Sequence, residues 1–291
     1  MSWYSAQRVR YFFSSVLGLG VSLYSAHAQT IDPATSLSPP KNDFSEAIED
    51  NSFLIEEAYN QEPGIVQHIS TGMYFATPHH DFQYAFTQEW PLAGQTHQLS
   101  YTIPYSFKNE NNAPGVGDIL LNYRYQLFTS SDWAAVAPRF SLIIPSGSVD
   151  KGLGSGTMGI QFAVPISKMF SDLFIVHLNA SATVLPGAKG TTMEGNEVRR
   201  ALSSFSIGGS VIFLATKNLN LMLEVLVNSI GDISETGDVV RSTETIVNPG
   251  FRTAIDLGEL QVVPGIGIPA SFLNGDRRIA MFLYLSFEHP F

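Results

Sequence analysis

The chain has 291 residues, of which 44% are hydrophobic and only 14% are charged, and its formal net charge is −10. Soluble domains carry about 25% charged residues, so this composition argues against an ordinary soluble domain. The acidic balance argues against a nucleic-acid partner. Cysteine is absent, which excludes a disulfide framework and any thiolate nucleophile or metal ligand.

Residues 1–28 have the features of a secretory signal peptide. Arg8 and Arg10 form a positive region, 11–24 is mostly apolar, and Ala26 and Ala28 form a small-x-small cleavage site. The apolar stretch is too short to cross a membrane as a helix. We therefore expect the mature chain to begin at Gln29.

Residues 29–63 differ in composition from the rest of the chain. The first part is polar and rich in proline, and 43–63 is acidic with scattered apolar residues such as Phe53 and Ile55. Two interpretations remain open for this N-terminal segment. It is either a periplasmic tail or a partial plug that folds back into the domain that follows.

From residue 64 to residue 291, apolar and polar residues alternate in about twelve segments of about ten residues, the strand length that crosses a bilayer in a barrel. In 219–227, for example, leucines and valines occupy the odd positions, whereas Asn220 and Glu224 lie between them. A period of two places each set on one face of a strand. The predicted strands are 65–74, 82–90, 99–107, 119–127, 133–143, 158–166, 174–182, 205–213, 219–227, 242–254, 260–270 and 278–288.

A membrane can be crossed only by helices or by closed barrels, because every backbone polar group must be satisfied internally. After the signal peptide, no apolar run is long enough for a helical span. The sequence therefore predicts an all-β fold, an antiparallel up-and-down transmembrane β-barrel of about twelve strands in the bacterial outer membrane, surrounded by lipid.

The connections support this prediction, since short periplasmic turns and longer external loops alternate in outer-membrane barrels. Short turns are expected at 91–95, 129–132, 167–172, 215–218 and 255–259. Longer loops are expected at 108–116, 145–153, 185–199 and 231–240. Five prolines lie inside the predicted strands, where each removes a ladder hydrogen bond. We expect Pro104, Pro165 and Pro249 to mark bulges or the ends of the membrane-embedded region. Pro138 and Pro264 lie in mid-strand, and the sequence does not explain them.

If the apolar set faces lipid, a mixture of acids and bases faces the lumen. These side chains either pair across the barrel and stabilise it, or line a water-filled path and set its selectivity. A barrel of about twelve strands lies between the small barrels that side chains fill and the large ones that leave a channel. The lumen-lining candidates are Glu89, Arg124, Arg139, His177, Glu224, Glu244, Arg252 and Glu288.

The sequence gives no sign of catalysis. It has no Gly-x-Ser-x-Gly nucleophile elbow, and its histidines lack the paired spacing of a metal site. We therefore expect no enzymatic activity, no cofactor and no metal site. The C-terminal Phe291, preceded by alternating apolar residues, resembles the signal that the outer-membrane insertion machinery reads, although His289 departs from that pattern.

Three stretches resemble outer-membrane proteins of the phenol meta-pathway group, which are labelled as transporters. They are Asn51-Ser-Phe-Leu-Ile-Glu-Glu-Ala-Tyr-Asn-Gln-Glu-Pro-Gly-Ile-Val-Gln-His68, Gly115-Val-Gly-Asp-Ile-Leu-Leu-Asn-Tyr-Arg-Tyr125 and Pro138-Arg-Phe-Ser-Leu-Ile-Ile-Pro-Ser-Gly147. The resemblance implies a Gram-negative outer-membrane barrel and passage of small hydrophobic or aromatic molecules, and it brings no catalytic residues.

The leading hypothesis is therefore a channel or uptake pore for a small-molecule solute. The alternative is a closed structural or surface-interaction barrel that acts through its external loops and transports nothing.

Overall fold

The computed structural model describes residues 52–76, 80–107, 114–258 and 260–290, and the predicted signal peptide and Phe291 lie outside these ranges. No helix in the described residues has the length and apolar character needed to cross a membrane. The strands are β1 (Ile65–Phe75), β2 (Asp81–Leu92), β3 (His97–Phe107), β4 (Gly115–Val116), β5 (Ile119–Tyr125), β6 (Ala135–Val136), β7 (Arg139–Ile144), β8 (Gly159–Ser171), β9 (Phe174–Thr191), β10 (Glu197–Thr216), β11 (Leu219–Ile233), β12 (Val239–Thr253), β13 (Ile255–Leu257), β14 (Leu260–Gly267), β15 (Ala270–Leu273) and β16 (Asp276–Pro290).

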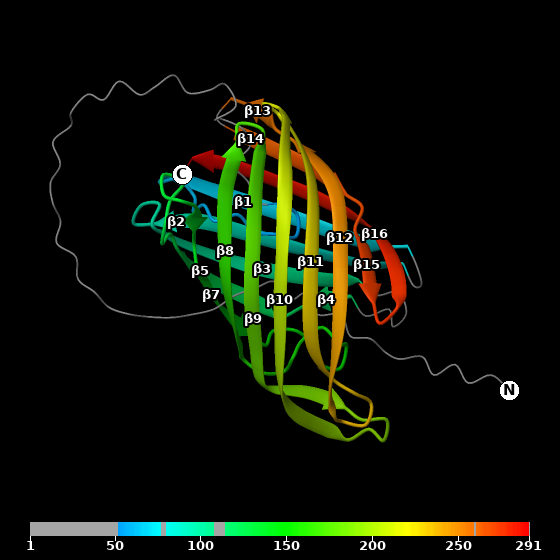
Figure 1. Ribbon diagram of the computed structural model, residues 1–291. Helices are drawn as coiled ribbons and strands as arrows, with labels where there is room; N and C mark the ends of the chain where they lie inside the picture. The colour runs from blue at the N-terminus through cyan, green and yellow to red at the C-terminus, as the bar shows by residue number, and fades with distance from the viewer. Residues whose placement is uncertain (1–51, 77–79, 108–113, 259, 291) are drawn as a thin grey trace, which may run out of the picture.

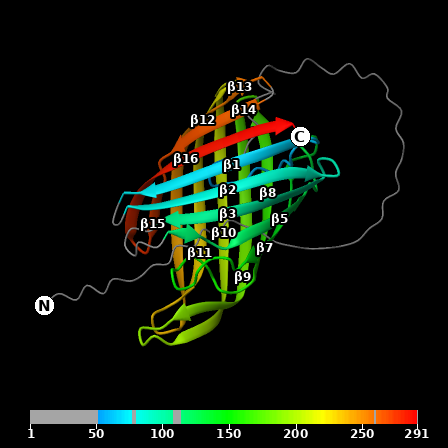
Figure 2. The same ribbon diagram turned by 180° about the vertical axis from the view of Figure 1, so that it is seen from behind.

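These segments form one closed antiparallel barrel (Figures 1 and 2). In four places two consecutive segments, β4 and β5, β6 and β7, β12 and β13, or β14 and β15, lie end to end as one stave, which gives twelve staves. β16 pairs with β1 from Ile65 opposite Pro290 to Phe75 opposite Ala280, and this ladder closes the wall. The predicted fold class is confirmed.

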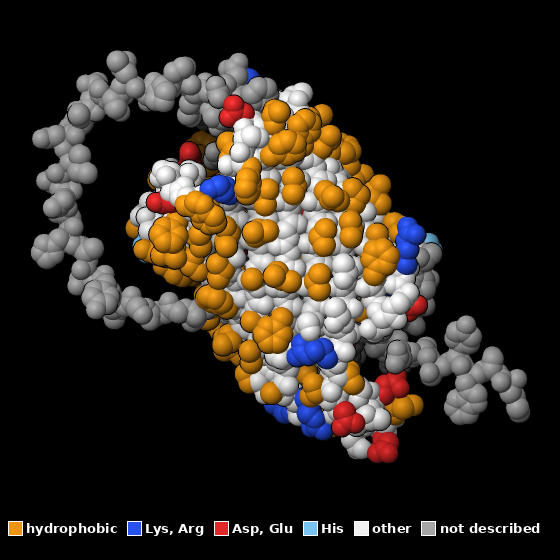
Figure 3. Space-filling model, viewed as in Figure 1, with side chains coloured by type: hydrophobic (Ala, Val, Ile, Leu, Met, Phe, Trp, Pro, Cys, Tyr) orange, Lys and Arg blue, Asp and Glu red, His pale blue; other side chains and the backbone are white. Residues whose placement is uncertain are grey.

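The side chains of the wall alternate between an apolar exterior and a largely polar interior. On β11, Leu221, Leu223 and Val225 are exposed on the outside, whereas Asn220 and Glu224 are fully buried on the inside. Figure 3 shows apolar side chains spread over the outer surface of the wall, and charged side chains grouped where the hairpins project. This arrangement is the one that lipid outside and a polar lumen inside require.

Four staves are longer than the alternation predicts, and two predicted loops are wrong. Most of 185–199 belongs to β9 and β10, which are joined at 192–196, and most of 231–240 belongs to β11 and β12, joined at 234–238. The two hairpins extend beyond the rest of the wall at one end of the barrel (Figure 1). Outside the membrane both faces of a strand can contact water, so apolar and polar residues need not alternate there. Strand pairing therefore continues beyond the region in which alternation could predict it.

All five prolines lie where the ladders are interrupted, which also explains Pro138 and Pro264, for which the sequence offered no reason. Pro104 faces the break between β4 and β5, and Pro165 faces the break between β6 and β7, where Pro138 lies. Pro249 faces the break between β14 and β15, and Pro264 lies beside the break between β12 and β13. Because each ladder is already open on one side at these points, the missing N–H groups leave no further gap in the pairing.

The outward face of the wall should not tolerate a charge. Ile207 on β10 is 63% exposed and lies midway along its stave. Ile207→Arg should therefore destabilise the barrel and lower its free energy of unfolding in a bilayer by about 2–4 kcal/mol, because the guanidinium must be placed in hydrocarbon. Equilibrium urea unfolding in liposomes measures this effect. Thr236→Arg in the β11–β12 connection is the control, and equal effects at both positions would contradict the assignment of the exterior.

Candidate functional site

Residues 52–61 lie inside the barrel, where side chains of the wall hydrogen-bond their backbone. Donors and acceptors come from strands far apart around the wall. The amides of Ala58 and Gln61 donate to Ser167 Oγ on β8 (2.7 Å) and to Gln98 Oε1 on β3 (2.7 Å). Asn179 on β9 contacts Glu56 twice, because its Oδ1 accepts from the Glu56 amide (2.8 Å) and its Nδ2 donates to the Glu56 carbonyl (2.9 Å). Polar wall residues thus replace water for an irregular chain segment.

Glu224 is the acceptor at the N-terminal part of this luminal segment, by which we mean residues 52–61. Its Oε1 accepts from the amides of Leu54 (2.8 Å) and Ile55 (3.2 Å), and its Oε2 accepts from Asn248 Nδ2 (2.7 Å). A buried carboxylate requires such donors, since its charge cannot be solvated by water there.

Arg124 plays the complementary part toward the C-terminal end of the luminal segment. Its guanidinium donates to Asn60 Oδ1 (2.8 Å), to the Tyr59 carbonyl (2.5 Å) and to the Glu57 carbonyl (3.2 Å). Glu89 Oε2 lies 3.7 Å from Arg124 Nη2 and balances its charge. One arginine on β5 therefore binds three successive parts of the segment at once.

A second buried ion pair joins the segment to the wall. Arg139 on β7 donates to Glu56 Oε1. Burying two charges is unfavourable unless they are paired, and breaking such a pair is strongly destabilising. Glu56 is therefore matched to Arg139 in position as well as in charge.

Phe53 lies in a recess that glycines create. Its ring stacks at a tilt on Phe282 and Tyr284, with centroids 5.2 and 5.4 Å apart. A Cβ atom on Gly250 would lie 2.5 Å from the ring, and one on Gly265 would lie 2.6 Å from it. The inward face of these strands thus has room for Phe53 only because both positions lack a side chain.

The chain leaves the lumen through a tight turn at Pro63 and Gly64. The Ile65 amide donates to the Glu62 carbonyl (3.1 Å), and Gly64 has a φ of +81°, a conformation that favours glycine. This turn takes the chain from the interior into β1.

The structure brings most of the sequence-predicted lumen candidates to the luminal segment. Arg124, Arg139 and Glu224 contact it directly, as described above. Glu89 binds Arg124 and accepts from Gln98 Nε2 (2.6 Å).

His177 is buried and bonds Ser167 Oγ through Nδ1 (2.6 Å), and Ser167 in turn accepts from the segment. Glu288 accepts from Gln67 Nε2 (2.8 Å). Arg252 is buried on β12, opposite Asn220. Glu244 does not contact the segment but lines the cavity above it.

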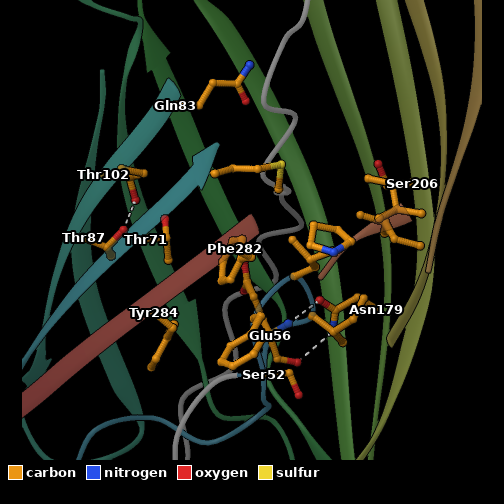
Figure 4. A pocket seen from close by; sticks show the side chains of 18 of the residues that line it. Ser52, Glu56, Thr71, Gln83, Thr87, Thr102, Asn179, Ser206, Phe282 and Tyr284 are labelled. Carbon is orange, nitrogen blue, oxygen red and sulfur yellow. Dashed lines mark hydrogen bonds between the residues drawn. The ribbon is translucent and has the colours of Figure 1, made fainter. Parts of the chain in front are cut away.

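A cavity of about 220 Å³ occupies the lumen next to the luminal segment (Figure 4). Thr87 and Thr102 on β2 and β3 bond each other there (2.9 Å) and face Ser206 across the barrel. Phe282 and Tyr284 on β16 also line it. A second cavity of about 90 Å³ shares part of this lining and continues toward the loop end.

At the loop end the connection between β7 and β8, residues 145–158, folds over the lumen. Asp118 holds it, because its carboxylate accepts from the Gly147 amide (2.9 Å) and from the amide and hydroxyl of Ser155 (both 2.7 Å). Leu153 of this connection lines the smaller cavity together with Leu120. The lumen is therefore narrowed by one segment at each end.

Sequence reasoning missed the neutral side chains that bind the segment, namely Ser167, Asn179, Gln98 and Gln126, and it missed Asp118. The alternation of apolar and polar residues placed these side chains on the inward face, but polar residues are common at inward positions of any polar lumen. The glycines at 250 and 265 carried a readable signal, since glycine inside a strand often marks close approach of another group.

Comparisons with known proteins give similarity at the level of fold. No protein-family model matches the chain, and no curated protein matches it. Among solved structures, an outer-membrane channel from Pseudomonas putida F1 is similar with a TM-score of 0.61 and 11% identity, over 80% of this chain and 98% of that chain. The fold is thus that of outer-membrane barrels, as the sequence predicts.

Two further solved structures are less similar. The NanC porin has a TM-score of 0.47 and 11% identity, and covers 77% of this chain and 100% of its own. The CymD monoaromatic hydrocarbon channel has a TM-score of 0.41 and 9% identity, and covers 79% and 89%. The narrower resemblance to the phenol meta-pathway group stays a prediction.

Removing an anchor of the luminal segment should release it. Glu224→Leu leaves two backbone amides and one side-chain amide without an acceptor, and Arg124→Leu leaves two carbonyls without their donor, at about 1–3 kcal/mol for each buried unsatisfied group. We expect faster cleavage after Glu56 and Glu57 by a glutamate-specific protease, and a lower free energy of unfolding. Asp238→Leu in the exposed β11–β12 connection is the control. Equally small effects at all three positions would refute the anchoring role.

The glycine recess offers a second, reciprocal prediction. Gly265→Ala should expel the Phe53 ring and expose the segment to the same protease, because the new methyl group would overlap the ring. Phe53→Ala should restore room for that methyl group, so the double variant should be less sensitive than the sum of the two single variants. Strict additivity would show that the ring and Gly265 do not interact.

Proposed function

We propose that this protein is an outer-membrane channel for small molecules whose lumen is closed by its own N-terminal segment. One observation carries the proposal. Residues 52–61 fill one end of the lumen beside a cavity, so side chains of the wall alone do not fill the barrel. A barrel with a purely structural role can be filled from its wall, whereas this one holds a segment that can leave without breaking a ladder.

The nature of the contacts supports a removable closure. Phe53, Ile55 and Ala58 pack against apolar parts of the wall, and the other contacts of the segment are hydrogen bonds and one ion pair. Water can replace such bonds once the segment moves, so the net free energy that holds each one is small, about 0.5–1.5 kcal/mol. The polar wall residues that bind the segment would then line a wet path.

The solute we propose is a small molecule with hydrophobic or aromatic character. The cavity has apolar side chains on β1 and β16, including Ile69, Met73 and Phe282, beside the polar ones. The channel from Pseudomonas putida F1 with the same fold is consistent with a channel role. The resemblance to the phenol meta-pathway group points in the same direction.

One observation favours the alternative, a barrel that acts through its exposed loops. The β9–β10 and β11–β12 hairpins project beyond the wall and carry charged side chains at their tips, such as Glu194 and Asp238. Deleting these tips should change surface interactions and leave permeability unchanged if the alternative holds.

Planar-bilayer recording tests the channel. We expect the full-length mature protein to show small or rare openings. A variant without residues 29–63 should show steady conductance at least tenfold larger, since the anchors of the segment then face water. Circular dichroism and heat-modifiable electrophoretic mobility establish that the variant keeps its barrel. A folded variant that shows no conductance would overturn the proposal.

A further inference from the structure

Among the three acids that line the 220 Å³ cavity, Glu244 differs from Glu56 and Glu89 in having no basic partner. Glu56 pairs with Arg139, and Glu89 lies beside Arg124. Glu244 is bonded by Ser271 Oγ and by Asn228 Nδ2 (3.4 Å). Within the part of the chain that the structure describes, no Lys, Arg or His forms an ion pair with it.

The neighbours of Glu244 are oriented for a charged carboxylate. Ser206 Oγ donates to Asn228 Oδ1 (2.6 Å), which leaves the amide nitrogen of Asn228 to donate to Glu244. Ser271 donates to the other oxygen. An ionised carboxylate only accepts hydrogen bonds, so a chain of donors that ends on it fits the anion.

This anion lines the 220 Å³ cavity, which is closed on one side by the luminal segment. A carboxylate in a cavity shielded from bulk water is unfavourable unless a positive charge lies close to it. Arg139, the basic side chain among the lining residues, is already paired with Glu56. The half-buried Glu244 therefore leaves the cavity with a negative charge that a bound cation would balance.

The rest of the lining indicates what kind of cation fits. Phe75, Phe282 and Tyr284 line the same cavity, together with Met73 and Ile69. Aromatic faces attract ammonium groups, and apolar side chains favour an organic body over a hydrated inorganic ion. The cavity thus combines an acceptor for positive charge with surface for hydrocarbon.

We propose that Glu244 makes this cavity a binding site for a small organic ammonium ion with an aromatic or aliphatic body. The inference rests on the proposed channel, because the ligand is the solute held between the two narrowed ends of the lumen. The inference specifies that the solute carries a positive charge, which the fold alone does not indicate.

Calorimetric titration of the full-length mature protein in detergent tests the site with three probes of nearly equal size. Benzylammonium carries a positive charge, benzyl alcohol is neutral and benzoate is negative. We expect benzylammonium to bind most tightly and benzoate most weakly. Glu244→Gln should weaken benzylammonium at least tenfold and change benzyl alcohol less than twofold, because Gln keeps the size of the side chain and removes its charge.

Two further variants separate charge from structure. Glu244→Asp keeps the charge and should keep benzylammonium binding within a fewfold of the unaltered protein. Asp238→Asn removes a carboxylate from an exposed connection and should have no effect. The inference is overturned if no probe binds, if benzoate binds as well as benzylammonium, or if the Asp and Gln variants lose binding equally.

This outcome is separate from that of the channel. If the variant without residues 29–63 conducts ions, and the Glu244 variants bind the probes as the unaltered protein does, the channel proposal is supported and the ammonium site is refuted. If Glu244→Gln loses benzylammonium binding but the variant without residues 29–63 shows no conductance, the ammonium site is supported and the channel proposal is refuted.

Discussion

The ladder between β1 and β16 is the interaction on which the rest of the structure depends. In hydrocarbon, an unpaired strand edge leaves a row of N–H and C=O groups without partners, each at a cost of several kcal/mol. Eleven consecutive residue pairs remove that edge. Closure with twelve staves then fixes the width of the lumen, and this width is greater than the wall side chains alone fill. Residues 52–61 and the cavity beside them occupy the remaining width.

Interrupted ladders are the second general feature, and they have one chemical cause. Proline has no N–H to donate, so a closed wall can hold it only where a neighbouring stave is already out of register. At Pro104 the local geometry is repaired by a bond from the Gly117 amide to its carbonyl (2.8 Å), and at Pro249 by one from the Ile268 amide (3.0 Å). The wall stays sealed although its regular pairing is broken.

The sequence predicted the wall well because lipid imposes a strict alternation on it. Twelve staves, their order along the chain and the inward side of Glu224 or Arg124 all follow from parity. The alternation fails as a guide where lipid ends, which is why 185–199 and 231–240 looked like loops. It also says little about β16, where Phe282 and Tyr284 face inward although Leu283 and Leu285 face outward. Both faces are apolar there, because Phe53 packs against the inner one.

The contacts of the luminal segment could not be read from the sequence for a different reason. They join the main chain of 52–61 to side chains such as Ser167 and Asn179, and main-chain groups leave no trace in composition. The acidic character of the region was visible, yet it suggested a solvated tail as readily as a plug. Two features carried a specific signal: the inward cation Arg139, which pairs with Glu56, and the glycines at 250 and 265, which make room for Phe53.

The turn at Gly64 has a consequence for the order of assembly. It places the residues that fill the lumen immediately before the first stave, whereas their partners belong to β3, β5, β8, β9 and β11. Those partners surround a common interior only after the sheet has curled into a cylinder. Residues 52–61 precede every stave in the chain, yet their full set of partners exists only in the closed barrel.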